Sequence, residues 1–337
     1  MSIMKNYLVR LSLGFLIAGQ LAFSIARAGS QPDSVSSVVG DTADPTHWPA
    51  TKWTPEETAL FEGAPVYHGD HKDLILLRYT YYVSEYDADR LCPLWVAHID
   101  EGDERPKAKL RTQSRDPQWA RIGFYPDDNV KTFSIAHNLP FVVDGSYTSP
   151  NPPELPDAPG GRLHITRGHN APNLEMKLEG DDADGERAQE ESFSLANVSP
   201  QTQHNNAPMW AALENSCLVY SAKFQRIAVI TGPVFSPDDS LPPPVNKIIF
   251  TKGAKGPPIP IPTHFFKIII ARIDGKISAE AYLVPHLSDL GKDDFEKYVV
   301  PISAIEAKTS LTFLPDDRDP ALKTAVDDRW QKALDAP

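Results

Sequence analysis

The segment Phe265–Ile273 constrains the fold of this chain most strongly, because it is a nearly continuous run of apolar residues. A run of this length and composition predicts a strand that is buried on both faces. Such a strand belongs inside a sheet rather than at its edge. The 32 prolines among 337 residues predict that the remaining elements are short and are joined by long loops.

Further strands are predicted where apolar, aromatic and β-branched residues cluster. They are 74–84, Leu94–Ile99, Leu163–Ile165, Ile227–Thr231, Lys247–Phe250 and Glu280–Val284. Helices are predicted at Pro55–Phe61, from Pro208 to Tyr220 and over 320–337. The acidic run 179–191 is interpreted as a solvated loop, with a cation or partner site as the alternative. The mixture predicts an α+β fold with a central, mostly antiparallel sheet flanked by helices.

The N-terminal 28 residues have the pattern of a cleaved secretory signal peptide. Lys5 and Arg10 precede the apolar stretch 11–23, and Ala26-Arg27-Ala28 places small residues at the two positions that a signal peptidase reads. An uncleaved membrane anchor is the alternative. The sequence thus predicts a signal peptide at 1–28, a loose N-terminal arm at 29–65, one folded domain at 66–316 and a C-terminal tail with a helix at 317–337. The protein is expected in the periplasm or outside the cell, without stable membrane association after cleavage.

The charge balance argues against a broad basic surface. The chain has 33 basic and 45 acidic side chains, a net charge of −12, and loss of 1–28 removes three basic residues and no acids, which leaves −15. An acidic protein does not attract nucleic acid or anionic lipid over long distances, although one arginine-lined cleft with a dication can hold a single phosphate. The two cysteines, Cys92 and Cys217, either form one disulfide or stay free, and sequence leaves both open.

The residues that carry chemistry lie between 166 and 214. The stretch contains Thr166-Arg167-Gly168-His169-Asn170-Ala171-Pro172, then Asn197 to Gln201, then Asn206, Trp210 and Glu214. The last three are spaced i, i+4 and i+8, so on an α-helix they drift by roughly 80° and share one broad face. An amide oxygen and a carboxylate opposite a strand-borne histidine can hold a hard divalent cation mainly through water, as Mg²⁺ prefers. An amphipathic helix with a buried tryptophan is the structural alternative.

These residues, in this order, resemble the signature of the DNA/RNA non-specific endonuclease family. The family pattern is Asp-Arg-Gly-His-x-Ala-Pro, a Ser-Asn-x-x-Pro-Gln stretch, and then Asn, Trp and Glu at fixed spacing. Flanking stretches are also similar, namely 93–97, 231–235, 261–267 and 304–309. The resemblance covers about 70–316. It implies a ββα-metal (His-Me finger) nuclease fold and metal-dependent hydrolysis of phosphodiester bonds in DNA and RNA.

Roles follow from the resemblance residue by residue. His169 would be the general base, Asn206 the direct ligand of Mg²⁺ (with Mn²⁺ as second candidate), and Glu214 would hold the waters of the metal. Arg167 would contact phosphate, and Arg121 would grip it from upstream, with Arg115 as runner-up.

Other positions in the pattern would support the site rather than act in it. Asn197, which completes the candidate catalytic set, and Gln201 would position the histidine strand and the helix. Trp210 is expected in the core. Two positions depart from the family: Thr166 replaces its Asp, and Leu218 stands where it has an arginine.

The leading functional hypothesis is an exported, Mg²⁺-dependent nuclease that cuts DNA and RNA with little sequence preference. The departures motivate a second hypothesis, a nuclease-fold binding module with impaired catalysis. A purely structural exported domain is the third. A homodimer and an inhibitor protein are further partner predictions.

Overall fold

The computed structural model describes residues 37–40, 48–102, 123–147, 165–177, 179–180, 182–203, 205–237, 248–251, 255–286, 295–316, 319–327 and 330. The predicted signal peptide and both upstream arginine candidates, Arg115 and Arg121, lie outside these residues. So does the stretch 148–161, whose five prolines and two glycines predict a loop. None of the helices in the described ranges is long and apolar enough to span a membrane. The predicted domain boundaries stay predictions.

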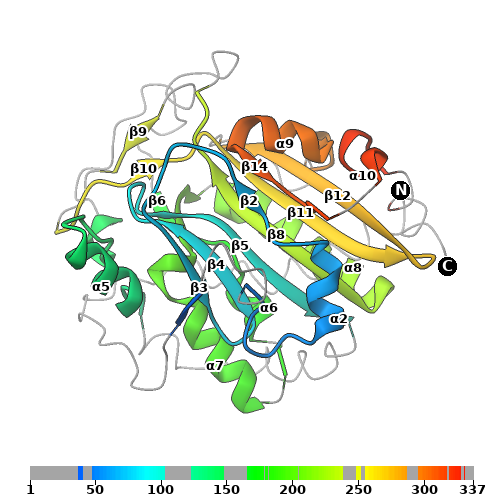
Figure 1. Cartoon of the computed structure of the whole chain (residues 1–337), viewed down its shortest axis with the longest axis horizontal. Coiled ribbons are helices and arrows are strands. Elements are labelled where there is room, and N and C mark those ends of the chain that lie inside the picture. The colour runs from blue at the N-terminus through cyan, green and yellow to red at the C-terminus, as the bar shows by residue number, and fades with distance from the viewer. Residues whose placement is uncertain are drawn as a thin grey trace. The chain divides into compact units, whose positions relative to one another are not determined.

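An eight-stranded sheet forms the centre of the fold, in the order β1-β3-β4-β5-β8-β11-β12-β13 (Figure 1). Every neighbouring pair in it is antiparallel. Its strands are β1 (Val38–Gly40), β3 (Leu74–Arg78), β4 (Tyr82–Asp87), β5 (Cys92–Glu101), β8 (Arg226–Val234), β11 (His264–Ile273), β12 (Lys276–Pro285) and β13 (Val299–Val300). Within the described ranges, three two-stranded sheets accompany it: β2 (Val66–Tyr67) with β14 (Leu311–Thr312), β6 (Ile165–His169) with β7 (Val198–Thr202), and β9 (Ile249–Phe250) with β10 (Pro260–Ile261).

Helices cover both faces of the central sheet, as the α+β prediction requires. They are α2 (Pro55–Thr58), α5 (Asp128–Ala136), α6 (Asn173–Met176), α7 (Asp182–Ser192), α8 (Ala211–Phe224), α9 (Ile302–Thr309) and α10 (Pro320–Thr324). Shorter turns are η1 (Ala59–Phe61), η3 (Asp144–Ser146), η4 (Leu195–Asn197), η5 (Asn205–Trp210) and η6 (Phe295–Tyr298).

Strand β11 is buried on both faces, which confirms the interpretation of its apolar run. Phe266 and Ile268 pack with η1 and α9 on one face, while Phe265 and Ile269 pack with α8 on the other. Helix α8 also packs against β5 and β8. The helix that follows the signature residues is therefore mounted directly on the middle of the sheet.

The segment 74–84 is a hairpin, β3 and β4, and not the single strand that its composition predicts. The chain reverses at 79–81, where Tyr79 N donates to Tyr82 O and the two tyrosine rings stack with centroids 4.1 Å apart. Thr80 at the tip is held by the carboxylate of Glu191, through its backbone N–H and its hydroxyl, each at 2.7 Å. The reversal depends on this contact from a distant helix, and no glycine or proline marks it.

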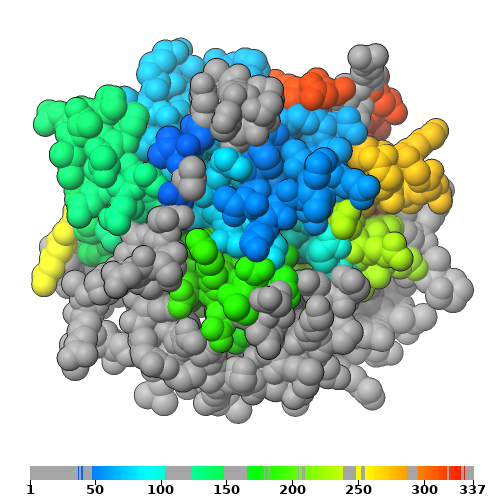
Figure 2. All heavy atoms as spheres, turned by 60° about the horizontal axis from the view of Figure 1, so that its bottom comes forward, coloured from blue at the N-terminus to red at the C-terminus, as the bar shows by residue number. Residues whose placement is uncertain are grey.

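The acidic run is a helix over most of its length, α7, so the prediction of a solvated loop is wrong. One side of α7 is buried, with Ala188 and Glu191 fully inaccessible, and Arg187 forms an i,i+4 ion pair with Glu191. In the space-filling view of Figure 2, the green spheres of this region lie against the blue and cyan surface of residues 48–102. The exposed charges Glu186 and Arg187 lie on the outer side of this amphipathic helix, whereas Glu191 lies on its buried side.

The arm at 29–65 is not loose where the structure describes it. Trp48 and Phe61 are buried in the core, with ring centroids 5.0 Å apart, and β1 pairs with β3. The short helix predicted at Pro55–Phe61 is present as α2 and η1, capped by Thr54. The terminal helix predicted over 320–337 is interrupted in the part that the structure describes, because α10 ends at Thr324 and Ala325 has extended backbone.

Both cysteines are free and buried, which settles the disulfide question against a bond. Cys92 contacts Ser199 and Val198 of β7, whereas Cys217 packs in the α8 layer.

Candidate active site

His169 ends strand β6, with its ring between two aromatic side chains. The ring centroids of Phe124 and Phe193 lie 5.2 and 5.5 Å from that of His169. The residue as a whole is half-buried, but its Nε2 is inaccessible and has no hydrogen-bond partner among the described residues. Burial lowers the pKa of His169 to about 4, since an apolar surrounding disfavours the imidazolium form. The imidazole is therefore neutral at pH 7, as a general base must be.

Arg167 lies two residues earlier on the same strand and shares an aromatic neighbour with His169. Its guanidinium lies over the ring of Phe124, 5.3 Å from the centroid, and 5.9 Å from that of Tyr147. Its Nε donates to Asp144 Oδ1 at 2.5 Å. Asp144 thus fixes one edge of the guanidinium, and the terminal nitrogens are the part left to meet a phosphate.

Asn197 clamps the loop that follows His169. Its Oδ1 accepts from Ala171 N at 2.8 Å, and its Nδ2 donates to Ala171 O and Ser192 O, both at 2.9 Å. The side chain is fully buried. Since these contacts occupy the amide, Asn197 positions the loop and does not face a substrate.

Gly168 of β6 and Gln201 of β7 lie close together across the hairpin, and Gln201 also contacts the following turn, η5. A Cβ added at Gly168 would lie 2.2 Å from Gln201 Oε1, so the glycine is needed for this close approach. Gln201 Nε2 in turn donates to Asn205 Oδ1 at 2.5 Å. The expectation that Gln201 supports both the histidine strand and the following helix agrees with these contacts.

Asn206 lies in η5, a π-helical turn that precedes α8, and not in an α-helix as its spacing suggests. A π-turn closes i→i+5 hydrogen bonds, so the shared face derived from α-helical geometry holds only from Ala211 onward. Asn206 Nδ2 donates to Thr166 Oγ1 at 3.3 Å. This contact joins the element that carries Asn206 to the strand that carries His169.

Glu214 lies in the first turn of α8 and belongs to a buried ionic cluster, whose other members are Lys267, Glu175, His98 and Asp100. Burial raises its pKa to about 8, Lys267 opposes this shift and Glu175 adds to it. Lys267 is fully buried, with its Nζ donating to Thr231 Oγ1 at 3.1 Å and lying 5.1 Å from the Trp210 ring centroid. Trp210 is itself 1% exposed, which confirms its prediction as a core residue.

Strand β5 contributes His98 and Asp100 to this cluster. His98 Nε2 lies 2.7 Å from Glu175 Oε2 and 3.6 Å from Asp100 Oδ1. Burial lowers the pKa of His98 to about 4 and raises that of Glu175 to about 7. Burial alone would lower the pKa of Lys267, but the surrounding acidic groups raise it, so the cation persists inside the fold.

The structure therefore joins four of the six predicted residues, His169, Arg167, Asn197 and Asn206, through contacts of one hairpin and η5. Glu214 follows along α8, and Arg121 lies outside the described residues. Sequence reasoning missed Phe124, Phe193, Asp144 and the ionic cluster. Only Lys267 had a signal, because a lysine inside an apolar run implies a buried partner.

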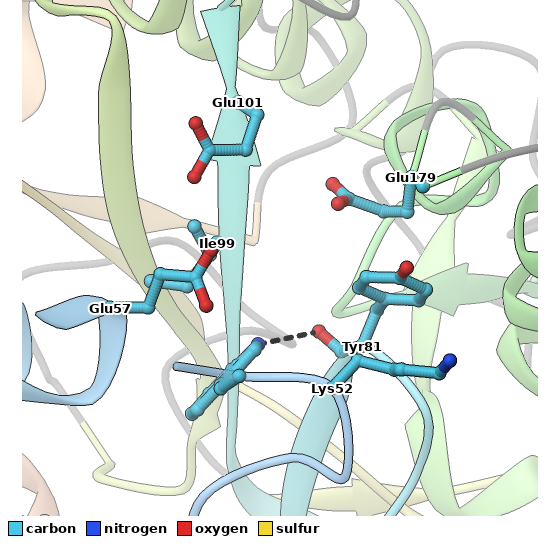
Figure 3. A pocket seen from close by; sticks show the side chains of 8 residues that line it. Lys52, Glu57, Tyr81, Ile99, Glu101 and Glu179 are labelled. Atoms are coloured by element: carbon cyan, nitrogen blue, oxygen red, sulfur yellow. Dashed lines mark hydrogen bonds between the residues drawn. The ribbon is translucent and has the colours of Figure 1, made fainter. Parts of the chain in front are cut away.

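A pocket of about 170 Å³ lies elsewhere, between the α2 region and the end of β5 (Figure 3). The carboxylates of Glu57, Glu101 and Glu179 line it together with Lys52. Three carboxylates disfavour a polyphosphate, and none of the predicted site residues lines this pocket. It is not the candidate active site.

Comparison with known proteins shows the family of the chain. The sequence profile of the family described as DNA/RNA non-specific endonuclease matches residues 64–319. The mitochondrial nuclease EXOG of Danio rerio is 27% identical over 243 residues, which cover 70% of this chain and 60% of that protein. Mitochondrial endonuclease G of Homo sapiens is 29% identical over 238 residues, which cover 70% and 68%. A chain in the crystal structure of the EndoG/EndoGI complex aligns with a TM-score of 0.48 at 21% identity, over 75% of this chain and 89% of that one.

The family profile, rather than any single relative, defines the class of protein. The chain belongs to the DNA/RNA non-specific endonuclease family, since the family profile spans most of it. The aligned region covers about three fifths of the EXOG relatives, 60% of the Danio rerio protein and 61% of the Xenopus laevis protein.

Proposed function

We propose that this protein is an exported, metal-dependent endonuclease that hydrolyses DNA and RNA with little sequence preference. The observation that carries the proposal is the β6–η5 arrangement. A neutral, ring-enclosed His169 shares its strand with Arg167, and the same strand is hydrogen-bonded to Asn206. A base, a phosphate-binding cation and an amide oxygen donor are thereby held in one structural unit.

His169 would take the proton from the attacking water. Its Nε2 is inaccessible, so Nδ1 would be the nitrogen that accepts the proton of the water, which requires the neutral tautomer with the proton on Nε2. The rings of Phe124 and Phe193 hold the imidazole in place and keep it neutral. Arg167, fixed by Asp144, would bind a non-bridging phosphate oxygen through its terminal nitrogens.

The side chains also fit a hard divalent cation. Within the described part of the chain Asn206 Oδ1 makes no hydrogen bond, and an amide oxygen combined with a carboxylate, here that of Glu214, would suit Mg²⁺ or Mn²⁺. When bound, such an ion would stabilise charge on the scissile phosphate and on the departing 3′-oxygen. Asn206 would be the direct ligand. Glu214 would hold ordered water, and the charge of a bound cation would lower the raised pKa of Glu214 and so favour the ionised form that this role needs.

Weak sequence preference follows from the contacts available. Arg167 would contact the phosphate backbone, and such contacts do not distinguish one base from another. The family's substrates are nucleic acids, and the net charge of −12 means that local contacts, rather than the overall field, would supply affinity. Export, a homodimer and an inhibitor protein remain predictions from the sequence.

The second candidate function is a binding module with impaired catalysis. It is favoured by Thr166 and Leu218, which replace an acid and an arginine of the family pattern, and by Asp144, which occupies one edge of Arg167.

One assay separates the two functions. The purified protein is incubated with supercoiled plasmid and with single-stranded RNA in Mg²⁺, in Mn²⁺ and in EDTA, beside Asn206→Ala. The enzyme is supported by cleavage of both polymers that leaves 5′-phosphate ends, stops in EDTA and requires far more metal in Asn206→Ala. Binding of either polymer without cleavage in any divalent metal would overturn it in favour of the module.

A further inference from the structure

Thr166, one of the two positions where this chain departs from the family pattern, makes two specific hydrogen bonds. Thr166 Oγ1 donates to the backbone carbonyl of Gln201 at 2.9 Å, across the β6–β7 hairpin. The same oxygen receives a hydrogen bond from Asn206 Nδ2 at 3.3 Å. One hydroxyl thus connects the histidine strand, its partner strand and the π-turn.

The direction of these bonds follows from counting protons. A hydroxyl has one proton and two lone pairs, and a backbone carbonyl can only accept. The proton of Thr166 therefore points to Gln201 O, and the hydroxyl presents a lone pair toward Asn206. Only the NH₂ end of the Asn206 amide can satisfy that lone pair, so Oδ1 must point the other way.

We propose that Thr166 is a positioning residue that selects the orientation of the Asn206 amide in which its oxygen is free to bind a divalent cation. The inference rests on the proposed function of Asn206 as metal ligand. An amide that flips would present NH₂ to the cation, which cannot coordinate it. The hydroxyl also limits rotation of the side chain before any ligand arrives, and this preorganisation favours binding.

The neighbouring residue shows that the turn is built to keep this arrangement. Asn205 is fully buried and is held by Gln201 Nε2, by Thr202 Oγ1 and by Pro285 O, at 2.5, 3.2 and 3.4 Å. The backbone at Asn206 is therefore fixed from one side. The Thr166 contact is the one hydrogen bond that the described residues make to the Asn206 side chain.

The test removes the hydroxyl while keeping the side-chain shape. Thr166→Val, Thr166→Ser and wild type are titrated with Mn²⁺ by electron paramagnetic resonance, without substrate. The Mg²⁺ dependence of plasmid cleavage is measured in parallel. Thr312→Val is the matched control, because it deletes a strand threonine hydroxyl that contacts His68 and no site residue. Circular dichroism and melting temperature show that each variant is folded.

The proposal predicts a rise in the Mn²⁺ dissociation constant and in the Mg²⁺ activation constant of Thr166→Val by roughly three- to tenfold, the range of a single hydrogen bond. Cleavage at saturating Mg²⁺ should return close to the wild-type rate. Thr166→Ser and Thr312→Val should stay within about twofold of wild type. An unchanged metal affinity in folded Thr166→Val, with wild type active and metal-dependent, would overturn the inference alone. Wild type that neither binds Mn²⁺ nor cleaves would instead overturn the proposed function.

Discussion

At the residue scale, the site depends on close approaches that leave no room for extra atoms. Gly168 is the clearest case, because its missing side chain is what lets Gln201 pack across the hairpin. Gln201 then reaches Asn205 at the start of the π-turn. The glycine in the signature therefore serves the geometry between two neighbouring elements and not a turn.

The variant Gly168→Ala tests this reading. An added Cβ would lie 2.2 Å from Gln201 Oε1 and 2.8 Å from Gln201 Cβ, so Gln201 must move and its bond to Asn205 should break. We expect a loss of about 1–3 kcal/mol in the free energy of unfolding, as for overpacked interiors, measured by urea denaturation. The loss should be smaller in a Gln201→Ala background. Equal costs in both backgrounds would show that Gln201 is not the constraint.

At the scale of elements, the charges with the largest effect on stability are the buried ones. Strand β11 places Lys267 on the α8 face, in register with Thr231 of β8, and the acids Glu175 and Glu214 approach it from two helices. A buried cation with acidic neighbours is costly to disrupt, because removal of one partner leaves the others uncompensated.

Lys267→Met should therefore destabilise the fold by about 3 kcal/mol or more, and equilibrium denaturation measures it. Arg272→Met is the control, since Arg272 is exposed on the same strand and bonds only to the Gly275 carbonyl among the contacts given for it. A stability of Lys267→Met equal to that of the control would mean that the cluster carries no net charge interaction.

Another buried acid, Glu85, predicts that the stability of the fold depends on pH. Burial raises the pKa of Glu85 to about 7, Trp95 opposes the shift through a 2.7 Å hydrogen bond and Asp87 adds to it. The unfolded state releases this proton near its ordinary pKa of ~4.3, so stability falls as pH rises from about 4.5 to about 7. Relative to Glu85→Gln, wild type should lose on the order of 2–3 kcal/mol between pH 5 and 8.

Chemical denaturation of both proteins across that pH range gives the difference directly. Exposed Glu186→Gln serves as the control and should run parallel to wild type. If the curves of wild type and Glu85→Gln were parallel as well, Glu85 would not be the buried titrating group.

Sequence predicted those elements whose signal is local. The apolar run of β11 and the strand pattern of β5 and β8 required no knowledge of partners. The hairpin at 79–81 and helix α7 were not predicted, because both depend on a contact between distant residues. Thr80 and Glu191, which stabilise each other, are 111 residues apart. The site residues followed from ordered motifs, whereas Phe124, Phe193 and Asp144 come from segments without a motif and are recruited only by packing.

At the scale of the whole molecule, export is the main prediction. Residues 1–28 carry the signal pattern, and the remaining chain is strongly acidic. Full-length protein produced in a bacterial secretion host should be recovered from the periplasm or medium, and intact-mass spectrometry should give Gly29 as its first residue. An Ala28→Glu variant should remain uncleaved. Wild type that retains Met1 and fractionates with membranes would support the anchor instead.

The central claim, that His169 is the base of a phosphodiester hydrolase, is tested most directly by one rate. The initial rate of plasmid nicking in Mg²⁺ is measured for wild type, His169→Ala and His137→Ala, each confirmed as folded. His137 is an exposed histidine at the end of α5, so its variant should keep the wild-type rate. Loss of a general base predicts a fall of roughly 10²- to 10⁴-fold for His169→Ala. A rate for His169→Ala within a few-fold of wild type would contradict the account.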